Sequence, residues 1–333
     1  MKKLQILIPQ YEETDEILKP MLDSIKIQEN IDFSDIGVII CNDGSDVKLS
    51  KKFLDSYPFE IIYKDCPHEG VSATRNACLK EATADYVEFC DADDMFYTVN
   101  ALWLILNEIR NSTFDALISA FMEENRNPLT KEVFYQPRGD VQMGGIDQTF
   151  VHGKVYRRNY LLAQSIKFDP DLTIHEDSYF TIQAIRLTTP DRVHYCPLPF
   201  YLWKWRDESV CRHDPKYILK TYNNMLDSNT KLVKSMRKRN RLQLAQEFVC
   251  QMIYDAYMTM NKSEWIDQEN QEYRHKTELR FKEYYKEFSY LYEDFPEEGK
   301  NQIYAGLKNR FMQEGMFMEE ITFKDWIKHI LEM

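Results

Sequence analysis

Residues 86–94 read Tyr86-Val87-Glu88-Phe89-Cys90-Asp91-Ala92-Asp93-Asp94 and decide the fold class of this 333-residue chain. The first five form a short aromatic and β-branched run that is typical of a strand, and they lead directly into three carboxylates within four positions. In open α/β sheets, ligands bind beyond the carboxyl ends of the strands. We therefore expect the functional residues to lie just after each strand.

Three more short apolar runs precede this one and end at polar or turn residues. They are predicted strands at residues 4–8, 37–41 and 59–63. Residues 15–28 and 72–83 carry apolar side chains at helical spacing, and Ser72 is expected to cap the second helix. This alternation predicts a mostly parallel sheet covered by helices on both faces.

Charge and proline content both change near residue 215. Residues 1–215 hold 23 basic and 35 acidic side chains, whereas residues 216–333 hold 19 of each, so the first part carries the whole net charge of −12. Long helical patterns follow, at residues 217–236, 242–260 and 270–292. We predict an α/β domain at 1–215 and an all-helical domain at 216–333.

The composition excludes several classes of protein. Hydrophobic residues make up 44% of the chain, which is typical of a folded globular protein. The longest wholly apolar run, residues 101–106, is far shorter than the roughly 20 residues of a membrane span. The start of the chain lacks the pattern of a signal peptide, so we expect a cytoplasmic protein, with the inner membrane surface as an alternative peripheral location. The seven cysteines form no Cys-x-x-Cys pair, which argues against a disulfide framework or a zinc knuckle.

The acidic run at 91–94 indicates a metal site. Carboxylates so close together repel one another unless a cation offsets their charge, and oxygen ligands suit Mg²⁺ or Mn²⁺. Upstream, Gly70-Val71-Ser72-Ala73-Thr74-Arg75-Asn76 places a glycine turn, a helix N-terminus and an arginine where a phosphate could dock. A metal and a diphosphate would fit one site. The alternative is a solvated acidic loop that only caps the next helix.

Four other segments carry candidate groups. Residues 9–13 and 42–46 follow predicted strands, where a carboxylate can bind a ribose hydroxyl or uracil and an aromatic ring can stack on the base, although turn chemistry alone also explains them. Glu176 and Asp177 open a predicted helix, as first-turn caps or as a general base. Residues 201–213 mix aromatic and cationic side chains that suit a sugar, a base or a diphosphate, or form a packed aromatic edge.

Taken in order, these segments resemble the inverting family-2 glycosyltransferases of the GT-A fold. The resemblance covers residues 1 to about 215 and rests on seven motifs in the order and spacing of the family. They are Ile8-Pro9-Gln10-Tyr11-Glu12-Glu13, Asn42-Asp43-Gly44-Ser45, residues 70–76, Asp91-Ala92-Asp93-Asp94, Gly153-Lys154-Val155-Tyr156-Arg157-Arg158, Glu176-Asp177 and Arg206-x-x-Ser209.

The resemblance implies a role for each matching residue. The nucleotide, usually uridine diphosphate, would be held by Pro9, Tyr11, Glu13 and Asp43, with Arg75 nearby. Asp91 would contact the ribose or the metal, and Asp93 would ligate Mn²⁺ or Mg²⁺. Asp177 would be the catalytic base and Glu176 would orient the acceptor. The diphosphate would be covered by Arg206, Arg212 or His213, and His213 is also a candidate metal ligand.

The family's processive members carry a Gln-x-x-Arg-Trp motif after the base, which residues 201–206 lack. We therefore expect transfer of single sugars from a UDP-sugar to an acceptor glycan: a surface polysaccharide, a wall polymer or a lipid-linked precursor. His152 receives no role.

Two alternatives stay open. The first is a bacteriophage-type enzyme that modifies hydroxymethylated pyrimidines in DNA. The basic run at 231–241 would then bind the DNA phosphates; the other interpretation of this run is a solvated helix face without a ligand. The second is a catalytically inactive sugar- or nucleotide-binding module. The helical tail would bind the acceptor or form a homo-oligomer, and its aromatic stretch at 284–292 would pack as helix core or mark a dimer surface.

Overall fold

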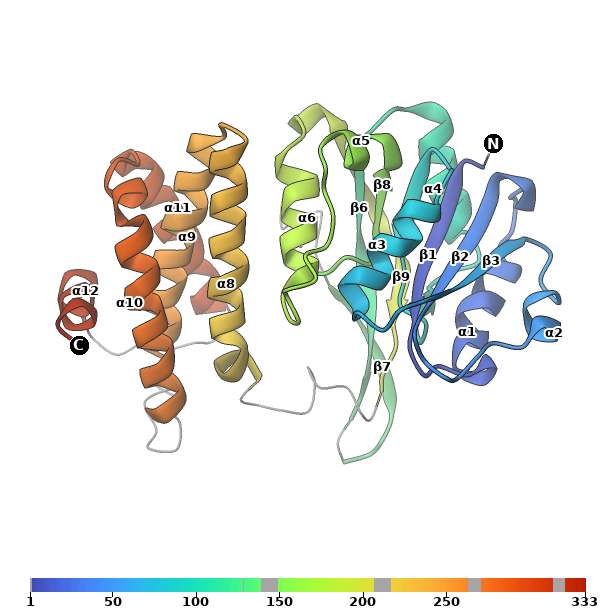
Figure 1. The fold of residues 1–333 in the computed structure, drawn as a ribbon, viewed down its shortest axis with the longest axis horizontal. Helices are drawn as coiled ribbons and strands as arrows, with labels where there is room; N and C mark the ends of the chain where they lie inside the picture. Colours follow the sequence, from blue (N-terminus) through green and yellow to red (C-terminus); the bar gives the residue numbers. More distant parts are fainter. Residues whose placement is uncertain (1, 128, 139–148, 207–216, 263–270, 314–320) are drawn as a thin grey trace. The chain divides into compact units, whose positions relative to one another are not determined.

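The computed structural model describes residues 2–127, 129–138, 149–206, 217–262, 271–313 and 321–333. The chain divides into two compact units, Met1–Ser209 and Val210–Met333, and each is described by itself (Figure 1). Every strand of the described residues lies in the first unit.

The first unit is built on one sheet, with the order β3-β2-β1-β4-β8-β6-β9-β5 and β7 paired with β6. The strands in the described residues are β1 (Leu4–Gln10), β2 (Ile36–Asp43), β3 (Glu60–Cys66), β4 (Tyr86–Phe89), β5 (Met95–Phe96), β6 (Ala116–Arg126), β7 (Val133–Arg138), β8 (Lys154–Arg157) and β9 (Val193–Trp203). Strands β1 to β4 pair in parallel, and β8 runs antiparallel between β4 and β6. The predicted α/β class is confirmed, with a mixed second half of the sheet.

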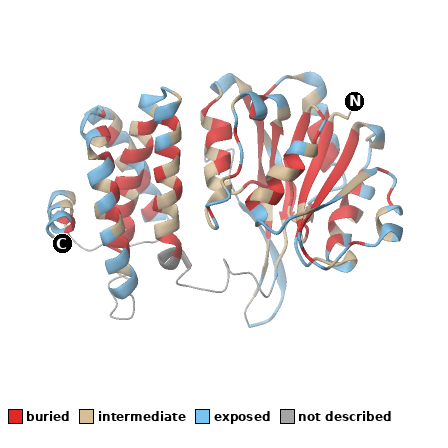
Figure 2. Ribbon diagram, in the orientation of Figure 1, coloured by how far each residue is buried: buried red, intermediate tan, exposed pale blue. Residues whose placement is uncertain are grey.

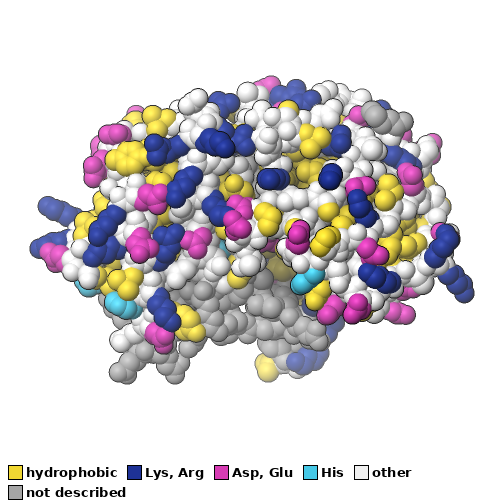
Figure 3. All heavy atoms as spheres, viewed as in Figure 1, with side chains coloured by type: hydrophobic (Ala, Val, Ile, Leu, Met, Phe, Trp, Pro, Cys, Tyr) yellow, Lys and Arg dark blue, Asp and Glu magenta, His cyan; other side chains and the backbone are white. Residues whose placement is uncertain are grey.

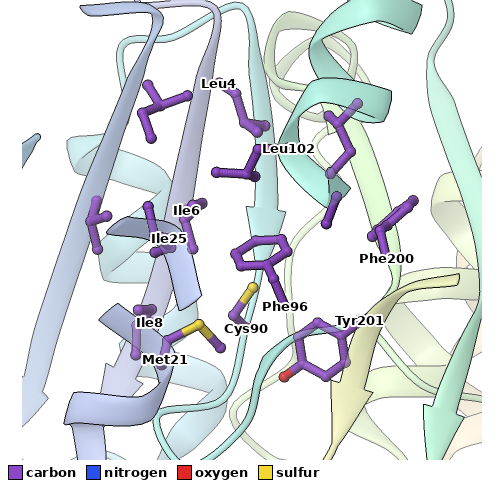
Figure 4. Packing of buried hydrophobic residues seen from close by; sticks show 14 of the residues in the cluster. Leu4, Ile6, Ile8, Met21, Ile25, Cys90, Phe96, Leu102, Phe200 and Tyr201 are labelled. Atoms are coloured by element: carbon purple, nitrogen blue, oxygen red, sulfur yellow. The ribbon is translucent and has the colours of Figure 1, made fainter. Parts of the chain in front are cut away.

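Helices cover both faces of this sheet. They are α1 (Asp15–Lys26), α2 (Lys51–Leu54), α3 (Val71–Glu81), α4 (Ala101–Asn111), α5 (Arg158–Ala163) and α6 (Glu176–Arg186), with short 3₁₀ turns η1 (Phe33–Asp35) and η3 (Pro190–Arg192). Because side chains alternate along a strand, Ile6 and Ile8 of β1 join the core under α1 and α4, where Figure 4 shows them near Met21 and Phe96. Helix α3 packs on β1 and β2. Figure 2 shows the strands as the most continuously buried elements of this unit.

The predicted N-cap of α3 is wrong. The chain turns at Gly70, whose φ of 86° is a conformation that favours glycine, and the helix begins at Val71. Ser72 is therefore already inside the helix. Its hydroxyl is buried and, among the described residues, has no hydrogen-bond partner.

The second unit is helical, as predicted. Its helices in the described residues are α8 (Tyr217–Lys238), α9 (Leu242–Met260), α10 (Gln271–Glu293), α11 (Glu297–Gln313) and α12 (Phe323–Glu332). Helix α9 packs against α8, α10 and α11. The aromatic stretch of α10 contributes to this core, because Tyr284 and Phe288 are buried, and the Tyr284 hydroxyl donates to Asn229 Oδ1 at 2.6 Å. Within the described residues, no helix is long and apolar enough to cross a membrane.

The basic run is partly engaged within this bundle. Lys234 pairs with Glu287 at 2.9 Å, and the Arg237 guanidinium lies 5.5 Å from the centre of the Tyr290 ring. Arg237 and Lys238 also lie in the last turn of α8, where the helix dipole favours cations. Packing and the helix dipole thus account for several of these charges. DNA binding through this run and oligomerisation through the bundle stay predictions.

Candidate active site

Arg75 lies at the centre of the candidate site. It projects from α3, is only 4% exposed, and its guanidinium donates to three carboxylates. The distances are 2.9 Å to Asp91 Oδ1, 3.1 Å to Glu176 Oε1 and 2.6 Å to Asp177 Oδ1. The guanidinium also lies 5.2 Å from the centre of the Phe168 ring. The acidic loop after β4 and the first turn of α6 therefore meet at one buried cation.

One guanidinium does not balance three carboxylates, and the pKa values of Asp177 and Asp91 shift in opposite directions. Burial raises the pKa of Asp177 to about 8, against the attraction of Arg75 and with added repulsion from Glu176 and Asp91. Burial would also raise the pKa of Asp91, but Arg75 and His152 hold it below its usual value. Two neighbouring carboxylates with opposite shifts are typical of a site in which one group stays ionised and the other exchanges a proton.

The middle aspartate of the acidic loop faces another cation. Arg206 donates to Asp93 Oδ2 at 2.8 Å, and the Arg206 side chain is 44% exposed. Burial, together with repulsion from Asp91, raises the pKa of Asp93. The pKa of Glu13 is also raised by burial and by the charge of Asp93, while its carboxylate accepts from the Tyr11 backbone N–H at 2.6 Å. The charges of three side chains therefore influence one another: Glu13, Asp93 and Arg206.

Asp94 is fixed by β9. The Tyr201 hydroxyl donates to Asp94 Oδ2 at 2.7 Å and accepts from the Asp91 N–H at 3.0 Å, and the Lys204 N–H donates to Asp94 Oδ1 at 2.9 Å. Tyr201 itself is fully buried, so this part of the aromatic edge packs in the core and presents no ring face to a sugar. The His152 ring stacks on Tyr201, with centres 4.8 Å apart and an angle of 6° between the planes.

The donor set fits a divalent cation. One ligand atom from each of Asp91, Asp94 and His152 lies within 4.8 Å of the others. Carboxylate oxygens suit Mg²⁺ and Mn²⁺, and an imidazole nitrogen is accepted by Mn²⁺ more readily than by Mg²⁺, which prefers oxygen ligands. This group includes the predicted ligand Asp91 and adds Asp94 and His152, while the carboxylate of the predicted ligand Asp93 faces Arg206.

A second set of residues lies where β2 ends. Asp43 is buried, and its carboxylate accepts from the N–H groups of Glu69 at 2.9 Å and Gly70 at 3.1 Å. His68 Nδ1 lies 3.1 Å from the same carboxylate, and its ring stacks on Tyr11 at 4.7 Å. The Tyr11 residue is 44% exposed. A stacked aromatic pair beside a buried carboxylate suits a planar base.

The remaining predicted residues divide into two groups. Pro9 is the second-last residue of β1 and is half-buried, which places it next to the segment that carries Tyr11 and Glu13. Arg212 and His213 lie outside the described residues. The sequence predicts no role for His68, His152 or Phe168. Their contact partners are distant in the chain, so no spacing pattern indicates that they belong to the site.

Comparison with known proteins identifies the class. Residues 5–184 match the model of glycosyl transferase family 2, which is more than half of the chain, and the chain belongs to this family. It is a glycosyltransferase with a GT-A-like fold, as the sequence motifs indicate.

The individual relatives share low sequence identity with this chain. The uncharacterized glycosyltransferase YwdF of Bacillus subtilis is 30% identical over 191 residues, which are 55% of this chain and 68% of YwdF. The poly(ribitol-phosphate) β-N-acetylglucosaminyltransferase TarP of Staphylococcus aureus is 22% identical over 56% of this chain and 58% of TarP. The crystal structure of residues 1–349 of S. aureus TarS in complex with UDP-GlcNAc has a TM-score of 0.63 and 17% identity, and covers 85% of this chain and 81% of that one.

Proposed function

We propose that this protein transfers a single sugar from a UDP-sugar to a hydroxyl group of a wall polymer or surface polysaccharide, with inversion at the anomeric carbon and with a divalent cation. One observation carries the proposal: Arg75 joins Asp91 of the acidic loop to Asp177 of α6, at 2.9 Å and 2.6 Å. A donor bound at the acidic loop would lie next to a carboxylate with a pKa near 8.

Each of these residues has a role in a single displacement reaction. The acceptor oxygen attacks the anomeric carbon, the bond between that carbon and the diphosphate oxygen breaks, and Asp177 accepts the hydroxyl proton. The diphosphate leaves as part of UDP, and Arg206, an exposed cation that pairs with Asp93, can neutralise its charge. Glu176, held by the same guanidinium, orients the acceptor. One displacement inverts the anomeric centre.

The cation would be held by Asp91 and Asp94 with His152, or by Asp93 once Arg206 turns to the diphosphate. When bound, it supplies positive charge to the leaving diphosphate. The burial of Asp94 supports this assignment, because a buried carboxylate is costly unless a positive charge lies nearby.

The donor and acceptor classes follow from chemistry and from relatives. Tyr11 and His68 offer a ring surface for a base, and a structurally similar protein was solved with UDP-GlcNAc. TarP, a relative, is named for transfer to poly(ribitol phosphate). No feature of the described residues specifically favours modified DNA as the acceptor.

The test measures binding first and turnover second. A thermal-shift panel of UDP-glucose, UDP-GlcNAc, UDP-galactose and GDP-mannose with MnCl₂ should show stabilisation by one UDP-sugar. UDP release from that donor is then compared in wild type, Asp177→Asn and Asp93→Ala, with and without EDTA, and with poly(ribitol phosphate) as acceptor.

We expect Asp177→Asn to bind the donor but to lose roughly 10²- to 10⁴-fold in transfer, the usual contribution of a general base. The matched control Asp55→Asn, an exposed aspartate that pairs with Lys51 on the same helical turn, should behave as wild type. Stabilisation by no nucleotide-sugar would overturn the proposal. If EDTA leaves the rate of transfer unchanged, the proposed role of the cation is wrong.

A further inference from the structure

A second pocket lies in the first unit outside the candidate active site. It has a volume of about 560 Å³ and is formed by the turn between β5 and α4, by residue 30 and by the middle of β9. Volumes of this size are typical of small-molecule sites. Its walls include two aromatic rings, Tyr97 and Trp103, and its lining residues carry no charge.

The polar groups of this pocket face solvent without partners from the protein. Trp103 and Tyr97 are 38% and 37% exposed. Asn100 occupies the N-cap of α4, yet its side chain makes no capping hydrogen bond. Within the described part of the chain, the side-chain polar atoms of Asn30, Thr98, Tyr97 and Trp103 likewise donate to and accept from no protein group. Amide, hydroxyl and indole N–H groups thus surround one space beside two ring faces.

The walls are held in place by buried hydrogen bonds. Gln28, only 7% exposed, donates to the Thr98 carbonyl at 2.8 Å and accepts from the Leu102 N–H at 2.8 Å. The Glu29 N–H donates to the Val99 carbonyl at 2.8 Å, and the Tyr97 N–H to the Phe200 carbonyl at 3.0 Å. Ligand-binding groups on a rigid frame bind with a smaller entropic cost.

We propose that this pocket binds a neutral pyranose ring of the acceptor glycan, a role that rests on the proposed function. Aromatic faces bind the apolar face of a sugar ring, and amides and hydroxyls bind its hydroxyl groups. The absence of charged side chains among the lining residues fits an uncharged ligand.

The pocket is close to the acidic loop along the chain. Tyr97 follows Asp94 by three residues through β5, which is about 10 Å of extended chain. The proposal therefore calls for an acceptor of several sugar units, with one unit in the pocket while another lies at the candidate active site. Binding at two places raises the effective concentration of the acceptor at the second.

The test is a binding titration monitored by tryptophan fluorescence and calorimetry, with chitotriose and maltotriose as neutral probes. We expect saturable binding of at least one probe by the wild type. Trp103→Ala should weaken it about tenfold, the loss that corresponds to one stacking contact. Asn100→Ala should weaken it less, and Tyr273→Ala, which removes an equally exposed ring from the second unit, should not.

Binding of neither sugar, or binding that Trp103→Ala and Asn100→Ala leave unchanged, would overturn the proposal. Circular dichroism of each variant verifies folding, and Trp103→Phe, which keeps a ring, should retain most of the affinity. Stabilisation by the UDP-sugar donor, measured by thermal shift in parallel, should be equal in wild type and Trp103→Ala. If no UDP-sugar stabilises the wild type, the proposed function is refuted, whereas the titration tests the pocket separately.

Discussion

Arg75 shows how a single buried residue can define a site. Its one positive charge faces three carboxylates, so the cluster carries an excess of negative charge when all are ionised. Burial is the main cause of the raised pKa of Asp177, and repulsion from Glu176 and Asp91 adds to it. The same charge imbalance would make removal of Arg75 costly, because buried carboxylates would lose their counter-charge. Reactivity and stability therefore depend on one side chain.

The pH dependence of catalysis should report the raised pKa of Asp177. A carboxyl with a raised pKa is protonated below that pKa and cannot act as a base. We therefore predict that kcat/KM rises with pH and levels off above an apparent pKa near 8. Glu176→Gln removes a neighbouring negative charge that raises the pKa of Asp177, so it should move this limb of the profile to lower pH. A limb that Glu176→Gln leaves in place would belong to another group.

Glu88 is a second buried carboxyl, with no part in the proposed reaction. It lies in β4, fully buried between Ile6 of β1 and Val155 of β8, and neither carboxyl oxygen has a hydrogen-bond partner among the described residues. Burial raises the pKa of Glu88 well above its usual value. The folded protein therefore holds this proton to higher pH than the unfolded chain.

We predict that Glu88→Leu stabilises the protein increasingly as pH rises. An unfolded glutamate loses its proton near pH 4.3. Above that pH, the free energy of unfolding of the wild type therefore falls by about 1.4 kcal/mol per pH unit, until the pH passes the pKa of Glu88 in the folded state. Urea unfolding at several values from pH 5 to 8 measures the difference between variant and wild type. Glu88→Gln, which is neutral but polar, should remove the same slope with a smaller gain. A difference that is constant with pH would contradict this.

At the scale of elements, the sequence predicts most of what local patterns control. Strands β1 to β4 and helices α1, α3, α8, α9 and α10 fall within a few residues of their expected positions, because apolar periodicity is a local signal. The prediction of Ser72 as the N-cap is wrong because α3 begins after a glycine with positive φ and not after a capping side chain. The contacts of Tyr201 with Asp94 and of Phe168 with Arg75 could not be predicted, since they join segments that only the tertiary fold brings together.

The turn after β2 offers a test of one such tertiary contact. Gly44 has a φ of 68°, and a Cβ added there would lie 2.6 Å from the His68 backbone nitrogen. Gly44→Ala should therefore displace the segment that stacks on Tyr11, lowering both stability, by about 1–3 kcal/mol, and UDP affinity. Thermal unfolding and UDP titration measure the two effects.

Gly70→Ala is the matched control for this turn. Its φ of 86° is also unfavourable for alanine, but an added Cβ would meet no atom within 4 Å. It should lose stability without displacing His68. Equal losses of UDP affinity in the two variants would show that backbone strain, and not the contact with His68, governs the base site.

At the scale of the whole molecule, charge and packing separate the two units. The first carries the acidic site, whereas the second is neutral in sum, and the face shown in Figure 3 intersperses basic with acidic side chains. Each unit has a core of its own: the sheet with α1 and α4 in the first, and the bundle around α9 in the second. Two cores of this kind predict two unfolding transitions.

Trp326 is the residue with which to separate them. It is fully buried in α12, with its ring centre 5.0 Å from that of Phe281 and 5.5 Å from that of Tyr257. Trp326→Ala should destabilise the helical unit by about 3–5 kcal/mol. Trp326→Phe should cost far less, since it keeps a ring and removes an indole N–H that has no hydrogen-bond partner in the described residues. Calorimetry should show one transition lowered, while stabilisation of the other by UDP-sugar persists. If both transitions fall together in Trp326→Ala, the two units unfold as one cooperative body, and the helical unit then supports the catalytic one directly.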